Sequence, residues 1–89
     1  MMLERLVTKY IKASEKVFTD LTVSKATINV DREKIEEVIE QAKRYLEDAK
    51  YYQKKDKFEI GLASISYCEG LLDALRLLGV IEISWPTRK

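Results

Sequence analysis

Residues 56–80 read DKFEIGLASISYCEGLLDALRLLGV, and this stretch sets the architecture of the chain. On a helical wheel its apolar and small side chains cover an arc of roughly 220°. A helix this apolar must be covered on more than one side. The stretch therefore predicts a helix over 57–78 that stops at Gly79, a residue suited to a left-handed C-terminal cap.

A second helix is predicted directly before this stretch. Asp31 is its expected N-cap, because a carboxylate there accepts amide hydrogens of the first turn, and Val30 with Ile35 are spaced for a hydrophobic staple. Apolar residues then recur at helical spacing. Asp56 with Glu59 forms a variant of the capping box for the third helix. The two helices are therefore joined by a very short turn and are expected to pack antiparallel.

The N-terminal part of the chain predicts one more helix, over 3–21, with a single apolar stripe. Residues 22–30 are rich in β-branched side chains and are expected to form an extended linker. The fold class is all-α, a three-helix bundle with a tight antiparallel hairpin between helices two and three. Helix three would be central, or the hairpin would be completed by a dimer. We expect one domain over 1–83 and a C-terminal tail over 84–89, in which Trp85 is either docked on the bundle or exposed.

Small residues gather in one sector of the third helix, at Ala63, Gly70 and Ala74. A glycine inside a helix costs about 1 kcal/mol relative to alanine. We expect Gly70 to be compensated by the close backbone approach of a neighbouring helix.

The amino-acid composition excludes several classes of function. The chain has 89 residues, a net charge of +1, no His and one Cys. The lack of His removes His-based catalysis and His metal sites, and a lone Cys can form neither an internal disulfide nor a zinc cluster. We expect no cofactor, no enzymatic activity, no membrane span and a cytoplasmic location. Near-neutral charge makes nucleic acid an unexpected partner.

Part of the sequence is similar to a known family. The residues that carry the likeness are Ala42, Tyr45, Asp48 and Ala49, then Asp56, then Tyr67, Gly70, Leu72, Asp73, Ala74, Arg76, Leu78 and Gly79. With them the chain resembles the archaeal domain of unknown function 357 family over about residues 35–83. Where that family often has His before the glycine, this chain has Glu69. The resemblance implies a small three-helix bundle and no known reaction. It also suggests an accessory role beside nucleotidyltransferase-like domains.

A polar strip on the third helix is the first candidate site. It contains Glu59, Ser66, Glu69, Asp73 and Arg76. Glu69 and Asp73 lie one turn apart, so they could bind a divalent cation or act as an acid–base pair. Arg76 would neutralise such a site, and a solvated strip is the plainer interpretation.

Tyrosines mark two further features. Tyr67 falls inside the apolar arc, where a core tyrosine with its hydroxyl at the rim is the plainer interpretation, although Tyr67 and Asp73 are our first choices for a specific role. A basic and aromatic cluster ends the second helix. It consists of Lys50, Tyr51, Tyr52, Lys54, Lys55 and Lys57. Such a cluster could bind single-stranded nucleic acid, but cations also suit a helix C-terminus.

The strongest functional signal is a surface for partner helices. Leu62 and Leu77 lie in or beside the polar strip, where a purely solvated face would not place them. We therefore predict a non-enzymatic interaction or accessory module that associates with itself or another protein. A ligand-binding or metal-binding protein that uses the acidic strip is the alternative. The candidate face consists of Leu62, Tyr67, Glu69, Asp73, Arg76, Leu77 and Trp85.

Overall fold

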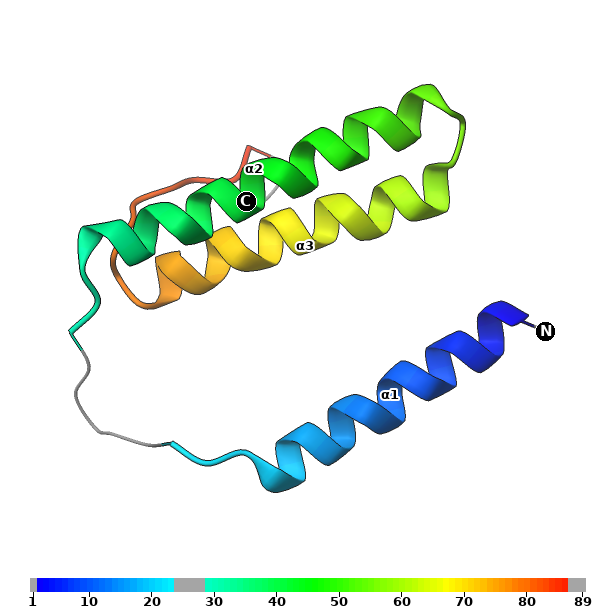
Figure 1. Cartoon of the computed structure of the whole chain (residues 1–89), viewed down its shortest axis with the longest axis horizontal. Helices are drawn as coiled ribbons and strands as arrows, with labels where there is room; N and C mark the ends of the chain where they lie inside the picture. Colours follow the sequence, from blue (N-terminus) through cyan, green and yellow to red (C-terminus); the bar gives the residue numbers. More distant parts are fainter. Residues whose placement is uncertain (1, 24–28, 87–89) are drawn as a thin grey trace.

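The computed structural model describes residues 2–23 and 29–86 and contains helices only (Figure 1). Helix α1 spans Met2–Asp20, α2 spans Arg32–Lys54 and α3 spans Phe58–Leu77. No strand occurs among the described residues. The predicted all-α class is confirmed, and each predicted helix is found within a few residues of its expected ends.

Helix α2 begins where the capping signal places it. The backbone of Asp31 is extended, and its Oδ1 accepts a hydrogen bond of 3.1 Å from the backbone N–H of Lys34. This bond satisfies one of the amide hydrogens that the first helical turn leaves unpaired. The predicted N-cap is confirmed.

The turn between α2 and α3 works differently from the prediction. Asp56 has a φ of 59° and closes α2: its N–H donates to the carbonyl of Gln53 at 3.1 Å, and the Lys57 N–H donates to the carbonyl of Tyr52 at 2.9 Å. These two bonds form a Schellman motif with Asp56 in the left-handed position. Lys57 is the N-cap of α3 and makes no side-chain capping bond. The proposed capping box was therefore wrong, because Asp56 terminates the preceding helix instead of starting the next.

Helices α2 and α3 pack along each other as an antiparallel hairpin, which confirms the tight pairing predicted (Figure 1). Small side chains dominate their contact. The buried residues of the two helices are Ala42, Gly61, Ser64, Cys68 and Leu75. A Cβ at Gly61 would lie 3.5 Å from the Ala49 carbonyl oxygen and 3.7 Å from Tyr52 Cβ. The two backbones therefore approach each other closely at Gly61.

The surroundings of Gly70 differ from those predicted. A Cβ at Gly70 would meet no atom within 4 Å among the described residues. The close approach expected at this glycine occurs instead at Gly61, nine positions earlier on α3. Gly70 lies on the exposed part of the helix.

Helix α1 stands beside the hairpin and does not pack on it. In Figure 1, α3 lies between α2 and α1, and α1 runs in the same direction as α3. Among the described residues, the only helix–helix contact is that of α2 with α3, and no residue of α1 is buried. Residues 21–23 and 29–31 are non-helical, as expected of a linker, whereas the remainder of the predicted linker, 24–28, lies outside the described residues.

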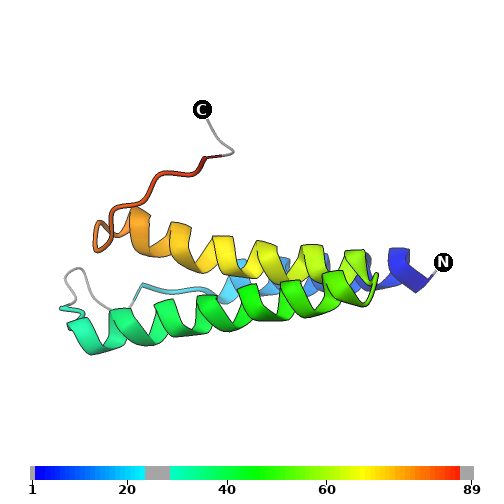
Figure 2. The same ribbon diagram turned by 90° about the horizontal axis from the view of Figure 1, so that it is seen from above.

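The C-terminal end of α3 follows its predicted signal. Gly79 has a φ of 78°, its N–H donates to the Arg76 carbonyl at 2.9 Å, and the Val80 N–H donates to the Leu75 carbonyl at 3.1 Å. This is a second Schellman motif. Beyond it the chain turns back over one side of the hairpin, as Figure 2 shows. The tail therefore continues the covering of α3 that α2 begins.

Candidate interaction surface

Asp73 joins the C-terminal tail to α3. Its Oδ1 accepts a hydrogen bond of 2.8 Å from Trp85 Nε1 and an ion-paired hydrogen bond of 3.2 Å from Arg76 Nε. Asp73 and Trp85 are both half-buried. Trp85 was expected to be either docked on the bundle or exposed, and the structure shows its indole docked on α3. Asp73 serves as an acceptor that holds the tail.

Tyr67 is not a core residue, which corrects one interpretation of the sequence. Its side chain is 62% exposed. Its ring stacks on that of Tyr45 of α2, with centroids 5.0 Å apart and an angle of 17° between the planes. The stacked rings form a contact between α2 and α3 at the surface of the hairpin. Sequence reasoning placed Tyr45 in the family resemblance but did not identify it as the partner of Tyr67.

Beside Tyr67 runs an uncovered, largely apolar line of residues on α3, here called the α3 seam. It consists of Ile60, Ala63, Tyr67, Gly70, Ala74 and Leu77, all exposed. Their spacing alternates between three and four residues, the repeat by which helices present a contact line to another helix. A shallow groove of about 450 Å³ opens along its middle, lined by Ala63, Ser66, Tyr67, Gly70 and Leu71.

The other predicted face residues do not all lie on this seam. Leu62 is 68% exposed and lines a separate groove with Leu46, Ala49 and Phe58. At 100° per residue it points about 140° away from Tyr67 around α3. Leu77, 76% exposed, belongs to the seam. The predicted face therefore divides into the seam, a groove at Leu62, and the half-buried Glu69 and Asp73 with Trp85 of the tail and the exposed Arg76.

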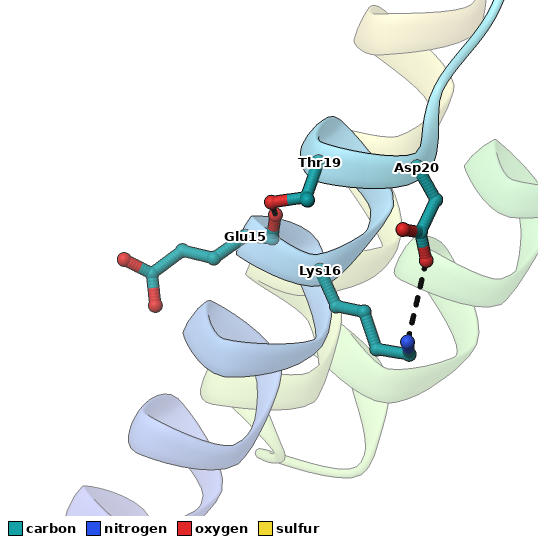
Figure 3. Close-up of polar contacts among 4 residues, drawn as sticks. All are labelled: Glu15, Lys16, Thr19 and Asp20. Atoms are coloured by element: carbon teal, nitrogen blue, oxygen red, sulfur yellow. Dashed lines mark hydrogen bonds and ion pairs between the residues drawn. The ribbon is translucent and has the colours of Figure 1, made fainter.

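Helix α1 carries a second uncovered apolar line, here called the α1 stripe. It consists of Leu3, Leu6, Val7, Tyr10, Ile11, Val17 and Phe18, all exposed. Two polar contacts of α1 stay within the helix: Lys16 Nζ pairs with Asp20 Oδ2 at 3.3 Å, and Thr19 Oγ1 donates to the Glu15 carbonyl at 3.0 Å (Figure 3). The amphipathic spacing was recognised from sequence, but the stripe was assigned to the core and not to a site.

The basic and aromatic end of α2 is largely occupied by local contacts. Tyr51 is exposed, and its ring meets that of Tyr52 edge-on, with centroids 5.3 Å apart. Lys55 Nζ lies 5.6 Å from the centroid of the Tyr51 ring. Lys50 pairs with Glu47 at 3.2 Å. Each of these contacts is explained by the helix and its turn alone.

Cys68 of α3 is buried, as is common for a small apolar side chain. Burial raises the pKa of its thiol above the ordinary value of 9.0, and the negative charge of Glu69 raises it further. A buried thiol with a raised pKa carries little of the nucleophilic thiolate near neutral pH. Cys68 is therefore suited to packing.

No group of three or more His, Cys, Asp and Glu side chains is placed to hold a metal ion in residues 2–23 and 29–86. Within those same residues, no helix is long and apolar enough to cross a membrane.

Comparison with known proteins gives one match. The family model described as Protein of unknown function (DUF357) matches residues 9–81, which includes the second half of α1, all of α2 and α3, and the start of the tail. No curated protein and no solved structure matches the chain. Since the match covers most of the 89 residues, the chain belongs to the DUF357 family.

Proposed function

We propose that the chain is a non-enzymatic protein–protein interaction module of the cytoplasm that binds a partner helix along the α3 seam. The observation that carries the proposal is the exposure of two apolar lines, the seam and the α1 stripe, in one small chain. Exposed apolar surface of this extent is uncommon on proteins that work alone, and it is typical of interaction sites. A helix laid in an apolar groove is a common form of such recognition.

The partner that we propose is either a further copy of the chain or an accessory partner such as a nucleotidyltransferase-like domain. The size pattern of the seam supports a helix as the bound element. Ala63, Gly70 and Ala74 leave room for a second backbone, and the large Tyr67 interrupts them at the centre. We favour this role over cation binding at Glu69 and Asp73, because Asp73 Oδ1 already accepts bonds from Arg76 and Trp85.

Photo-crosslinking in living cells tests the proposal. A photoreactive phenylalanine analogue replaces Gly70 in the middle of the seam, and in a matched control it replaces Glu36 on the outer face of α2. Both positions are exposed. We expect protein adducts from position 70 and none from position 36. Absence of adducts at position 70, or equal labelling at both positions, would overturn the proposal.

A further inference from the structure

Helix α3 is covered on two sides and bare on a third. Gly61, Cys68 and Leu75 are buried against α2. Trp85 of the tail docks on Asp73. The residues of the α3 seam are all exposed, although the ring of Tyr67 also stacks on Tyr45 of α2. Gly70 lies on that seam, and among the described residues a Cβ at this position would meet no atom within 4 Å. The helix therefore bears the cost of a mid-helix glycine, although nothing within one chain approaches closely enough to require a glycine there.

The α1 stripe fits the seam in length. At 1.5 Å per residue, the stripe from Leu3 to Phe18 is about 22 Å long, and the seam from Ile60 to Leu77 is about 26 Å long. A helix of 19 residues with no tertiary contact is marginal in water, since most helical stability in proteins comes from packing an apolar face. Helix α1 therefore needs a surface of the kind that the seam provides.

The two lines also fit in side-chain size. The α1 stripe is interrupted between Ile11 and Val17, at Ala13 and Ser14. When this gap is set opposite Tyr67, the larger Tyr10 and Val17 fall opposite the small residues of the seam, one on Ala63 and the other on Gly70. This match holds for either direction of the docked helix, because Tyr10 and Val17 lie at equal distances from the gap, and Ala63 and Gly70 lie at nearly equal distances from Tyr67.

Within a single chain, the α1 stripe and the α3 seam do not cover each other. Helix α1 makes no contact with its own hairpin among the described residues. Residues 21–31 join α1 to α2, which is longer than the 2–8 residues usual between helices of a bundle. Fully extended, this linker reaches about 36–40 Å, enough to carry α1 to a neighbouring molecule. The family match begins at residue 9, so much of α1 belongs to the same unit as the hairpin.

Resting on the proposed function, we propose that the partner helix is α1 of a second copy of this chain. Each copy inserts its α1 stripe onto the α3 seam of the other, and the contact is reciprocal. Since each chain supplies one donor helix and one acceptor seam, two copies satisfy both and the assembly closes as a two-fold dimer.

Sedimentation equilibrium of the purified full chain gives the first test. The native chain is expected to have twice its formula mass of 10.4 kDa. Tyr10→Glu places a charge in the centre of the α1 stripe and is expected to yield monomer, with the helicity of the hairpin kept. Lys12→Glu, on the opposite face of α1, is the matched control and is expected to stay dimeric. A monomeric native chain, or a Tyr10→Glu variant as dimeric as the control, would overturn the dimer.

Crosslinking identifies which α1 occupies the seam. Two variants, Ser14→Cys and Gly70→Cys, are made in a Cys68→Ala background, given tags of different mass, mixed, and treated with a short bismaleimide. We expect a product of the summed mass. A third chain carrying both cysteines is expected to link between chains. If it links only within one chain, α1 closes on its own hairpin and the second-copy proposal fails.

The results separate this inference from the proposed function. Cellular adducts at position 70 with other proteins, together with a monomeric purified chain, would leave the proposed function standing and remove the second copy as its partner. Absence of cellular adducts, of dimer and of any crosslink would remove both.

Discussion

Asp31 shows how much one side chain contributes at a helix start. Residue 31 is exposed, and among the described residues its carboxylate bonds only the Lys34 N–H, so its effect is local and separable from packing. Asp31→Ala is expected to destabilise the chain by about 1 kcal/mol, because the Lys34 amide hydrogen loses its side-chain acceptor and keeps only the backbone carbonyl at position 31, 3.1 Å away. Urea unfolding followed by circular dichroism measures the loss. Asp31→Asn keeps an acceptor oxygen and should retain most of the stability; an equal loss in both variants would contradict the capping role.

Cys68 provides a probe of the contact between α2 and α3. Its burial and raised pKa both suppress thiolate at the surface, so native Cys68 is expected to react with a maleimide about tenfold more slowly than in urea-unfolded chain, or slower still. The control is Ser66→Cys in a Cys68→Ala background, since Ser66 is exposed two residues away. Equal native rates for Cys68 and the cysteine at position 66 would show that the helices do not shield the thiol.

At the residue scale, the local signals were interpreted correctly where a residue borders a single helix, and wrongly where it lies between two. Asp31 before a run of apolar periodicity and Gly79 after one were both predicted and found. Asp56 was misread because aspartate suits two positions, the start of a helix and the left-handed residue after one, and the sequence does not distinguish them. Periodicity likewise groups residues by face but does not say which face meets a neighbour, so Gly70 was preferred to Gly61.

At the scale of the elements, the turn between α2 and α3 contains one residue with a strained backbone conformation, and a substitution can relieve this strain. A left-handed backbone costs a residue with a Cβ roughly 1–2 kcal/mol, and glycine avoids it. Because Asp56 has a φ of 59°, Asp56→Gly is expected to stabilise the hairpin by about 1 kcal/mol. Thermal unfolding gives the measurement. Asp56→Ala keeps the Cβ and removes only the carboxylate, so a gain as large as that of glycine would refute the backbone explanation.

The pairing of α2 with α3 depends on small side chains at their crossing. Gly61→Leu is expected to cost about 1–3 kcal/mol, because its side chain must enter space now held by the Ala49 carbonyl and Tyr52. Gly61→Ala is the control: its Cβ would sit at ordinary contact distances, so alanine should be tolerated. Equal tolerance of leucine, measured by urea unfolding, would mean that the helices lie farther apart than described.

The sequence predicted the helices better than their arrangement. Each amphipathic pattern is local, so 3–21 and 57–78 were placed within a few residues of α1 and α3. Tyr67 fell inside the apolar arc and was expected in the core, yet it is 62% exposed, because among the described residues its ring is covered on one face by Tyr45 and α1 does not pack on α3. The candidate face was predicted as one surface and is divided by the docked tail and the Tyr45–Tyr67 stack. Such a division depends on tertiary packing that periodicity does not contain.

At the scale of the whole molecule, the fluorescence of Trp85 in the tail measures whether the tail is docked on the hairpin. Trp85 is the one tryptophan of the chain, and its indole N–H donates to Asp73. Asp73→Ala removes the acceptor, so the fluorescence of Trp85 is expected to shift to the red as the ring becomes wetter. Emission spectra of the native and variant chains measure this. Glu82→Ala, an exposed tail position, is the control, and an unchanged spectrum for Asp73→Ala would show that the bond does not hold the tail.

The scarcity of large buried side chains in the hairpin affects how the chain responds to temperature. Unfolding proteins gain about 12–15 cal/mol/K per residue, chiefly because apolar surface becomes hydrated. Among the described residues, a single copy of this chain buries Ala42, Cys68 and Leu75 as its apolar interior, so the hydration of apolar surface changes little when it unfolds. Its heat-capacity increment is accordingly small for its length, and its stability varies gently between cold and warm conditions. Calorimetry of the separated chain would display a broad, low endotherm.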